Sequence, residues 1–393
     1  MNFDFPKEDM EFRRKVEEFV KNEMPSDWEE KALYWPAGYG TLAIMEEEYK
    51  APCDVLLRKM GENGWLSLSW PKEYGGMNSM MKQAILQDVL SYYRLPFGDI
   101  SNWMAAPTII MAGSEKMKKT WLPRIARGEL RFWLGYSEPD AGSDLGSMQT
   151  RAEDNGDHFV VNGQKVWSSG AHIADYAWLM VRTGNTKQKQ HGLSLMIVDN
   201  ASPGITVRPI ENICGIHSFN EVFFDQVRVP KENLVGELNK GFYYLMYALL
   251  HERLMIGIGT FRKVFEELVS YIKSHKTIKN DRLIKKQIAD LYIEIEALYG
   301  FYWKTAWLID QGASADRESS ALKLFGTELS KKIADTAVEI MGHYGQLLQG
   351  DRAPFQGKFA LGYLDAISGL VGAGTSEIQR LIIATRGLGL PRN

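Results

Sequence analysis

The chain has 393 residues, of which 45% are hydrophobic, and this length is sufficient for two or three domains with a substantial core. Its formal net charge of −3 lacks the basic surplus that is typical of proteins that bind nucleic acids or anionic membranes, so neither partner is expected. The two cysteines, Cys53 and Cys214, lie far apart without a CxxC spacing, which predicts buried thiols and neither a disulfide framework nor a metal site.

Residues 1–130 are predicted to form an N-terminal helical domain. Apolar residues recur there at intervals of three and four, as in "FRRKVEEFVKNEM" and "DVLLRKMGENGW". The N-terminus mixes acidic and basic residues on an amphipathic pattern, unlike a signal or transit peptide, and no window approaches a transmembrane span. A cytoplasmic location is therefore expected.

Residues 131–240 change to a period of two and are predicted to form a small β domain, a barrel or a sandwich. The run "DHFVVNGQKVWSS" is expected to turn back as a hairpin at Asn162-Gly163, and "YAWLMVRT" and "GLSLMIVD" follow as strands. Residues 241–393 return to helical periodicity, beginning with the run from Phe242 to Lys273, and predict a bundle of long helices. The fold class is therefore α+β, with a β domain between two helical domains.

Several common catalytic motifs are missing from the chain. It has no complete dinucleotide-binding glycine fingerprint, no Walker loop, no HExxH and no GxSxG. Nicotinamide-dependent, nucleotide-hydrolysing, metalloprotease and serine-hydrolase functions are therefore disfavoured.

The stretch "WLGYSEPDAGSDLGSMQT", residues 133–150, opens from a strand into a loop dense in Gly, Ser and Asp. Its hydroxyl and backbone N–H groups suit a phosphate or the edge of a polar ring. The same composition also suits a solvated loop, and Glu138, Asp140 and Asp144 would repel a bare phosphate. Both interpretations stay open on composition alone.

The stretch "VWSSG", residues 166–170, places two hydroxyls after an aromatic plane. Trp167 is suited to stack on a flat heterocycle, with Ser169 hydrogen-bonded to a ring nitrogen. A Trp packed in a sandwich core explains the same pattern equally well.

The stretch "HERLMIG", residues 251–257, places Glu252 and Arg253 inside an otherwise apolar helical run. Burial would raise the pKa of such a carboxyl, which suits a proton acceptor that works near neutral pH. An ion pair with an arginine is the equally supported alternative.

At these residues the sequence resembles the acyl-CoA dehydrogenase family, over nearly the whole chain. Four segments carry the resemblance, in the order and at about the spacings of the family: "YSEPDAGSD", "NGQKVWSSG", "FNEVFFDQVRVPKENLVGELNKGF" and "GAGTSEIQRLIIATRGLGLPR". The resemblance implies a helical N-terminal domain, a middle β domain and a C-terminal four-helix bundle. It also implies an extended FAD cofactor.

The resemblance further implies a set of residues that contact the cofactor. Ser169 would lie near flavin N5, while Gly142 and Ser143 would lie near the pyrophosphate or the thioester. The full implied set is Tyr136, Ser137, Gly142, Ser143, Trp167, Ser168, Ser169, Thr375 and Glu377.

The resemblance also implies where the catalytic base lies. Many family members carry a glutamate directly before the "GT" of the C-terminal signature, but here that residue is Ala373. Isovaleryl-CoA and long-chain acyl-CoA dehydrogenases take the glutamate from an "ER" pair on the helix that opens the bundle, which Glu252 and Arg253 match. Glu252 is therefore the expected base, and Ser143, Arg253, Ala373 and Gly374 are the expected substrate-binding residues.

Two departures from the family pattern affect the expected contact with the FAD of a neighbouring subunit. Lys276 replaces the arginine of an "RxxFG" segment and supplies charge without a bidentate fork. In "EIMGHYG", Glu339 stands in place of a glutamine, three residues before Gly342. These three residues remain the expected cross-subunit contacts.

The function implied by the resemblance is FAD-dependent α,β-dehydrogenation of an acyl-CoA to a trans-2-enoyl-CoA. An electron-transfer flavoprotein would accept the electrons, and the enzyme would be a homo-oligomer, a dimer of dimers, or a heterotetramer. Two alternatives stay open: a partner subunit that is non-catalytic or only partly catalytic, and an oxygen-using flavoenzyme of the same fold.

Overall fold

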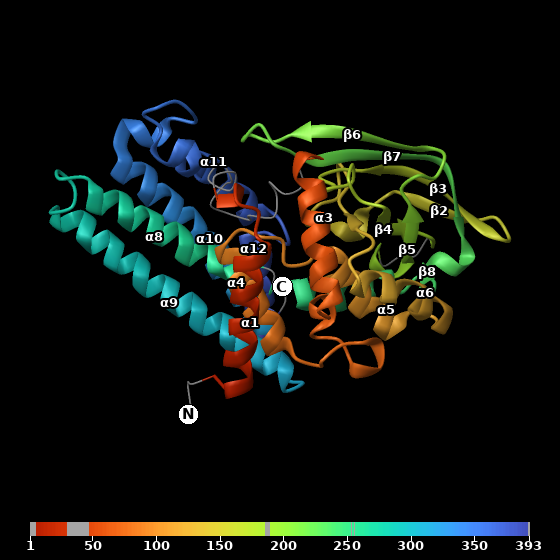
Figure 1. Cartoon of the computed structure of the whole chain (residues 1–393). Helices are drawn as coiled ribbons and strands as arrows, with labels where there is room; N and C mark the ends of the chain where they lie inside the picture. The colour runs from red at the N-terminus through yellow and green to blue at the C-terminus, as the bar shows by residue number, and fades with distance from the viewer. Residues whose placement is uncertain (1–4, 30–46, 185–188, 253, 255, 392–393) are drawn as a thin grey trace. The chain divides into compact units, whose positions relative to one another are not determined.

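The computed structural model describes residues 5–29, 47–184, 189–252, 254 and 256–391 (Figure 1). Its contacts divide these residues into two units. The helical unit comprises the described residues within 1–43, 78–97 and 253–393, and the sheet unit comprises those within 44–77 and 98–252. The N-terminal segment predicted as one domain, residues 1–130, contributes to both units, so the three-domain division stays a prediction.

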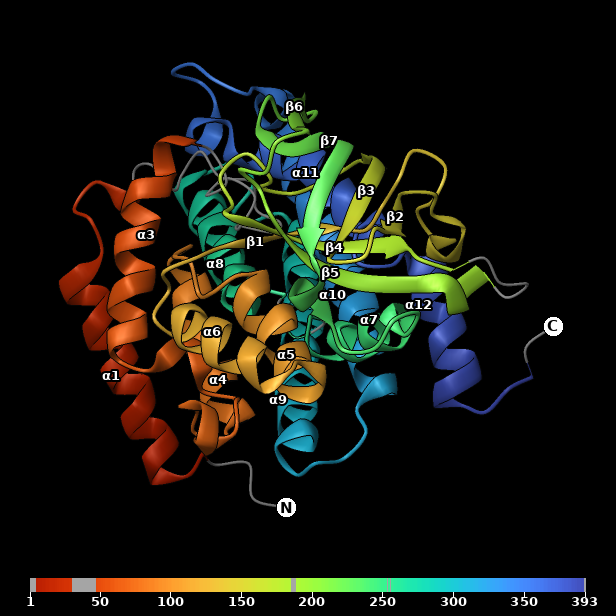
Figure 2. The same cartoon turned by 90° about the vertical axis from the view of Figure 1, so that its right-hand side faces the viewer.

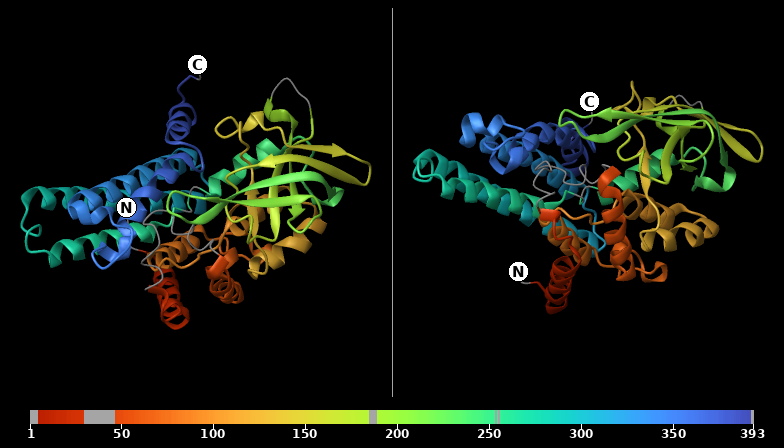
Figure 3. Two further views of the ribbon diagram at one scale, coloured as in Figure 1. Left: turned by 90° about the horizontal axis from the view of Figure 1, so that it is seen from above. Right: turned by 45° about the horizontal axis from the view of Figure 1, so that its top comes forward.

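Long helices build the helical unit, as predicted for the C-terminal part of the chain. Helices α8, α9, α10 and α11 run alongside one another (Figure 3), and α1 packs on α4. The helices are α1 (Lys7–Glu23), α4 (Met80–Tyr92), α8 (Ile258–Ser274), α9 (Arg282–Asp310), α10 (Asp316–Met341), α11 (Lys358–Val371) and α12 (Ser376–Ile382), with short helical turns at Gly342–Gln346, Pro354–Gly357 and Ile383–Gly387.

The sequence of α9 shows why such a long helix forms. The carboxylate of Asp281 accepts hydrogen bonds from the N–H groups of Leu283 and Ile284 and so caps the first turn. Further along, the buried residues Leu291, Ile295, Leu298 and Tyr302 recur at helical spacing and face the core. The apolar stripe therefore fixes which face of α9 is buried.

The predicted continuous helix from Phe242 to Lys273 is wrong. Helix α7 (Gly241–Glu252) ends in the sheet unit, and α8 begins at Ile258 after Gly257, which has a left-handed φ of +57°. A Cβ on Gly259 would lie 2.0 Å from the Asp88 carbonyl oxygen of α4. This close approach to α4 sets the start of α8, and the sequence period alone does not reveal it.

The sheet unit contains the β part of the chain, as predicted. The strands are β1 (Phe132–Gly135), β2 (Arg151–Asp154), β3 (His158–Lys165), β4 (Tyr176–Arg182), β5 (Leu193–Asp199), β6 (Ile205–Glu211), β7 (His217–Pro230) and β8 (Leu234–Val235). They pair in the order β6-β7-β3-β2-β4-β5-β8, and β1 pairs in parallel with β4. The pairing of β3 with β7 brings residues 57 to 72 positions apart in the chain side by side.

The hairpin turn predicted at Asn162-Gly163 is also wrong. These residues lie within β3, and the turn between β2 and β3 forms at a second Asn-Gly pair, Asn155-Gly156, where Gly156 has φ of +81°. Gly163 has another role, because a Cβ there would lie 2.6 Å from the Cα of Thr150. Gly163 therefore permits close packing of the strand against Thr150 and does not reverse the chain.

Four helices accompany the strands within the sheet unit: α3 (Glu47–Glu62), α5 (Ala106–Ala112), α6 (Glu115–Ala126) and α7, with short helical turns at Trp65–Ser67, Lys72–Tyr74, Ser101–Ala105, Leu145–Ser147, Lys189–Gly192 and Lys231–Asn233. Figure 2 shows α5, α6 and α7 on one side of β4 and β5. Trp121 of α6 contacts the rings of Phe132 and Tyr176 at centroid distances of 5.8 and 4.7 Å. Aromatic packing thus attaches α6 to the sheet.

The two cysteines differ in their surroundings. Cys53 is buried, as predicted, and burial raises the pKa of its thiol to about 12. Cys214 lies in a loop and is only half-buried, so the prediction of two buried thiols is wrong for it. None of the described helices has a stretch long and apolar enough to span a membrane.

Candidate active site

Two segments predicted to bind a flavin meet in the sheet unit. The N–H of Val166 donates to the carbonyl oxygen of Ser137 at 2.9 Å, and the ammonium of Lys165 donates to the carbonyl oxygen of Tyr136 at 3.1 Å. The end of β1 and the end of β3 are therefore joined. Tyr136 and Ser137 consequently lie close to the segment from Trp167 to Ser169, although about 30 residues separate them in the chain.

Trp167 does not pack in a sandwich core. Its side chain is 60% exposed, and its backbone has a left-handed φ of +57°, which is unfavourable for a residue with a side chain. Ser169 is partly exposed, whereas Ser168 is buried and its hydroxyl has no hydrogen-bond partner among the residues that the structure describes. An exposed indole on a strained backbone is typical of a ligand-binding segment.

A buried ion pair lies beneath the two segments. The Lys165 ammonium is 2.8 Å from the Glu138 carboxylate, and both side chains are buried. Burial lowers the pKa of Lys165 to about 8. Burial also disfavours the charge on Glu138, but Lys165 and the N–H groups of Gln149 and Thr150 overcome this effect and hold the pKa of Glu138 below its ordinary value. Both groups are therefore charged near neutral pH.

This ion pair corrects the expectation that Glu138 repels phosphate from the loop, because its charge is buried and compensated. Asp144 is exposed and paired with Lys189 at 3.1 Å, and Asp140 is exposed. Gly142 and Ser143 lie between them on the loop surface, and a Cβ on Gly142 would meet nothing within 4 Å. The loop surface at these two residues is therefore open to a ligand.

In the helical unit, residues 373–377 form a tightly held turn at the start of α12. Ala373 and Gly374 have left-handed φ angles of +53° and +86°. The buried ammonium of Lys323 donates to the Gly374 carbonyl oxygen at 2.8 Å, and the Gln379 amide donates to the Ala373 carbonyl oxygen at 3.1 Å. These bonds fix the orientations of the peptide groups in the turn. The side chain of Ala373 cannot accept a proton, so this position does not supply a base.

Thr375 and Glu377, the other two residues of this segment with a predicted role, lie at the N-terminus of α12. Thr375 is the N-cap residue, and its hydroxyl accepts a hydrogen bond from the N–H of Ile378 at 3.2 Å. Glu377 is exposed, and hydrogen bonds from its own N–H and from Thr375 hold the pKa of its carboxyl below the ordinary value. Its negative charge near a helix N-terminus is also favourable.

The three predicted cross-subunit residues lie at element ends in the helical unit. Lys276 is exposed in the turn between α8 and α9, Glu339 is exposed in the last turn of α10, and Gly342 follows with φ of +58°. Gln287 of α9 lies 3.5 Å from the Glu339 carboxylate. Contact of these residues with a cofactor stays a prediction.

Glu252, the predicted base, is the last residue of α7. Its side chain, and the whole of Arg253, lie outside the described part of the structure. The backbone thus places Glu252 at a helix end, and its role as a proton acceptor stays a prediction.

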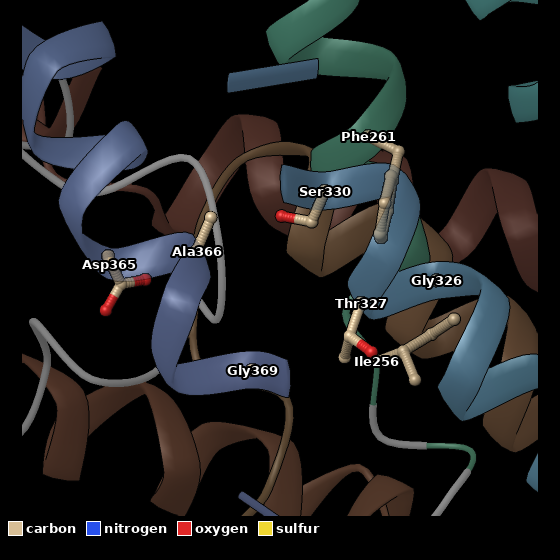
Figure 4. A pocket seen from close by; sticks show the side chains of 8 residues that line it. All are labelled: Ile256, Phe261, Gly326, Thr327, Ser330, Asp365, Ala366 and Gly369. Atoms are coloured by element: carbon tan, nitrogen blue, oxygen red, sulfur yellow. The ribbon is translucent and has the colours of Figure 1, made fainter. Parts of the chain in front are cut away.

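The helical unit also contains a cavity of about 20 Å³, which is room for one water molecule. Residues of α11 line one side and residues of α10 the other, and the Ser330 hydroxyl points toward α11 (Figure 4). Asp365 also lines the cavity, is buried, and has one carboxylate oxygen without a partner among the described residues. Burial raises its pKa to about 7 against a weaker opposite effect of Ser368.

Asp365 therefore makes stability depend on pH. Its ordinary pKa is 3.8, so between about pH 4 and pH 7 the folded chain binds the proton that the unfolded chain has lost, and stability falls as the pH rises. We expect Asp365→Asn, which cannot ionise, to gain stability relative to the parent by on the order of 1–4 kcal/mol between pH 5 and pH 8.

Urea unfolding at pH 5 and at pH 8 measures the difference in stability between Asp365→Asn and the parent. Asp351→Asn, at an exposed turn residue, is the matched control and should change stability equally at both pH values. If the difference in unfolding free energy between Asp365→Asn and the parent is also the same at pH 5 and pH 8, Asp365 keeps its charge in the folded state.

Sequence reasoning missed the buried polar residues that hold these segments, namely Lys165, Lys323 and Asp365. For Lys165 a signal existed, because it lies an even number of residues after the inward-facing Phe159 and Val161 of the same strand. For Lys323 and Asp365 a usable signal is absent, since both interrupt helices in which polar residues are common.

The sheet-unit residues fit a flat, polar heterocycle. The indole of Trp167 offers a stacking surface, Ser137 and Ser169 are partly exposed residues that carry hydroxyls, and the Ser168 hydroxyl lacks a partner in the described structure. No group of three or more His, Cys, Asp or Glu side chains is placed to hold a metal ion within the described ranges.

Comparison with known proteins identifies the family. The chain matches the N-terminal domain of acyl-CoA dehydrogenase at residues 6–129, the middle domain at 134–227 and the C-terminal domain at 239–388. The chain belongs to the acyl-CoA dehydrogenase family and is an oxidoreductase that acts on acyl-CoA. Family members are flavoproteins that use FAD.

Relatives and solved structures agree with this assignment. The chain is 35% identical over 361 residues to acyl-CoA dehydrogenase FadE29 of Mycobacterium tuberculosis, covering 88% of this chain and 91% of that protein. It resembles the Tcur3481-Tcur3483 steroid acyl-CoA dehydrogenase with a TM-score of 0.88, 30% identity and complete coverage of both chains. The ChsE4-ChsE5 complex of Mycobacterium tuberculosis matches with a TM-score of 0.87, 31% identity and complete coverage of both chains.

Proposed function

We propose that this protein binds FAD and dehydrogenates an acyl-CoA thioester between its α- and β-carbons. One observation carries the proposal: the two segments that resemble the flavin segments of the family are hydrogen-bonded to each other and present Trp167, Ser137 and Ser169 to solvent. When FAD is bound, it supplies the acceptor for the β-hydrogen, which leaves the substrate as hydride.

Glu252 is proposed to remove the α-proton. A carboxylate is a suitable base for this step if its surroundings raise its pKa toward neutrality. The turn at Ala373 supports the assignment, because its side chain cannot accept a proton and the other family position for the glutamate is therefore vacant.

Negative charge grows on the thioester oxygen as the α-carbon loses its proton. Hydrogen-bond donors that are already oriented toward that oxygen stabilise the charge without reorganisation. The Ala373 N–H is proposed as one such donor, and the bonds from Lys323 and Gln379 to the neighbouring carbonyl oxygens support it by keeping the turn rigid.

Electron transfer and assembly are proposed by analogy with the family. An electron-transfer flavoprotein would reoxidise the enzyme. The chain would act as a homo-oligomer or beside a second, related subunit, and one solved relative is the ChsE4-ChsE5 complex.

The purified protein is expected to be yellow and to lose its visible flavin absorption when a suitable acyl-CoA is added without oxygen. A panel of straight, branched and cyclic acyl-CoAs identifies the substrate class, and the corresponding free acids are the control. A yellow protein that no acyl-CoA reduces would contradict the proposed reaction. A colourless protein that takes up no FAD would support the partner-subunit alternative, and rapid reoxidation by air alone would support an oxygen-using enzyme.

A further inference from the structure

Asn220 of β7 holds the main chain of Ser168 in place through two hydrogen bonds. The Ser168 N–H donates to the Asn220 carbonyl oxygen at 3.0 Å, and the Asn220 side-chain amide donates to the Ser168 carbonyl oxygen at 2.9 Å. Both residues are fully buried. One asparagine thus binds both main-chain groups of the residue between Trp167 and Ser169.

The orientation of the Asn220 amide follows from its partners. The Ser168 carbonyl oxygen can only accept, so the amide nitrogen must face it, and that nitrogen also lies 3.0 Å from His172 Nδ1. The amide oxygen then faces His217 Nε2 at 2.8 Å. Consequently His217 carries hydrogen on Nε2, and His172 accepts through an unprotonated Nδ1.

The two histidines also support each other. Their rings stack with centroids 3.9 Å apart and an angle of 22° between planes. His172 lies three residues after Ser169, whereas His217 begins β7, so the stack joins the two parts of the chain that Asn220 bridges. The amide is therefore held from both sides in the only orientation that satisfies Ser168.

The Trp167 segment depends on this support. A left-handed backbone is unfavourable at a residue other than glycine, so it persists only where surrounding contacts impose it. The Trp167 ring meets the Phe219 ring edge-on, with ring centroids 6.1 Å apart. Because Trp167 is largely exposed, its ring contributes little packing to hold the backbone. The bonds between Asn220 and Ser168 can impose the conformation on one side of Trp167, and the bond from the Val166 N–H to the Ser137 carbonyl oxygen holds the other side.

We propose that Asn220, oriented by His172 and His217, is a positioning residue for the flavin site. It fixes the left-handed Trp167 and thereby the placement of the Trp167 ring and the Ser169 hydroxyl. This inference rests on the proposed function, because it assigns these two side chains to the flavin. Asn220 itself acts through the Ser168 peptide and touches neither cofactor nor substrate.

Asn220→Asp tests the inference because it keeps the side-chain shape and removes the N–H donors. A carboxylate oxygen would then face the Ser168 carbonyl oxygen, and the segment should relax. We expect the FAD-loaded variant to bind acyl-CoA with a KM within about 3-fold of the parent, while its flavin is reduced about 10–100-fold more slowly, because misplacement by about 1 Å has effects of that size. Flavin fluorescence should rise as the Trp167 ring moves.

Asn212→Asp is the matched control on the same loop and hairpin. The Asn212 side-chain oxygen accepts from the N–H groups of Cys214 and Ile216, and a carboxylate can do the same with the same change in charge. The Asn212 amide nitrogen also lies 3.4 Å from the Ser218 hydroxyl, which can donate to a carboxylate instead. It should leave reduction and fluorescence near those of the parent. Equal effects of the two variants, or no effect of Asn220→Asp, would overturn the inference.

If Asn220→Asp does not fold, a pair of substitutions at His217 provides the test. His217→Gln retains an N–H donor toward the Asn220 oxygen and should reduce its flavin at near the parental rate, whereas His217→Leu should be slow. Equal reduction rates of the pair would contradict the positioning role. A colourless parent protein would overturn the flavin assignment and this inference together, whereas a yellow, reducible parent with an unaffected Asn220→Asp would overturn only the inference.

Discussion

Glu252→Gln is expected to fold, to hold FAD and to bind acyl-CoA, yet to leave its flavin oxidised when substrate is added without oxygen. The substitution keeps the size of the side chain and removes only its ability to take a proton. A positioned general base contributes about 10²–10⁴-fold, so single-turnover reduction should slow by at least that factor. Stopped-flow absorption of the flavin measures the rate.

The matched control is Glu237→Gln, which changes an exposed glutamate that is paired with Lys240 shortly before α7. It should reduce its flavin at the parental rate. If Glu252→Gln also does so, Glu252 is an ion-pair partner and the base lies elsewhere.

A second substitution tests the alternative position of the base. Replacing Ala373 with Glu in the Glu252→Gln background places a carboxylate where many family members carry theirs. Ala373 already has a left-handed backbone, so a second residue with a Cβ brings no new backbone conflict. Partial recovery of reduction would show that a base at either position reaches the same substrate carbon.

Lys165→Met is expected to have the largest effect on stability. It removes the cation from a buried pair and leaves the Glu138 carboxylate in the protein interior with only N–H donors. Breaking a buried ion pair by removing one partner typically costs about 3–5 kcal/mol. Because Lys165 also holds the Tyr136 carbonyl oxygen, the variant should lose FAD more readily than the parent.

Lys189→Met is the matched control, since it breaks the exposed pair with Asp144 in the same loop region. An exposed pair is worth about 0–1 kcal/mol, so the two variants should differ clearly in urea unfolding. Adding Glu138→Gln to Lys165→Met should recover part of the loss by removing the unpaired charge. Equal stabilities of Lys165→Met and Lys189→Met would show that the buried pair is not held together in the folded protein.

The fold class, the three-part helical and β pattern, and the family could all be predicted from the amino-acid sequence. These properties follow from local periodicity, as in the stripe of Leu291, Ile295 and Leu298 along α9, and from segments that resemble those of known proteins. The absence of a base at Ala373 was likewise visible in the sequence, because it depends only on residue identity.

Which of two Asn-Gly pairs turns the hairpin, and where the helical run breaks, depends on contacts between residues distant in sequence. Gly163 was expected to turn the chain and Gly257 to continue a helix, but Gly163 packs on Thr150 within a strand and Gly257 breaks the helix next to Ser91 of α4. The exposure of Trp167 was undecidable for the same reason, because both a core and a ligand surface accept a tryptophan. The bonds from Lys165 and Asn220 that hold its segment join residues between 27 and 52 positions apart, and pairing at such separations is set by strand register rather than by local preference.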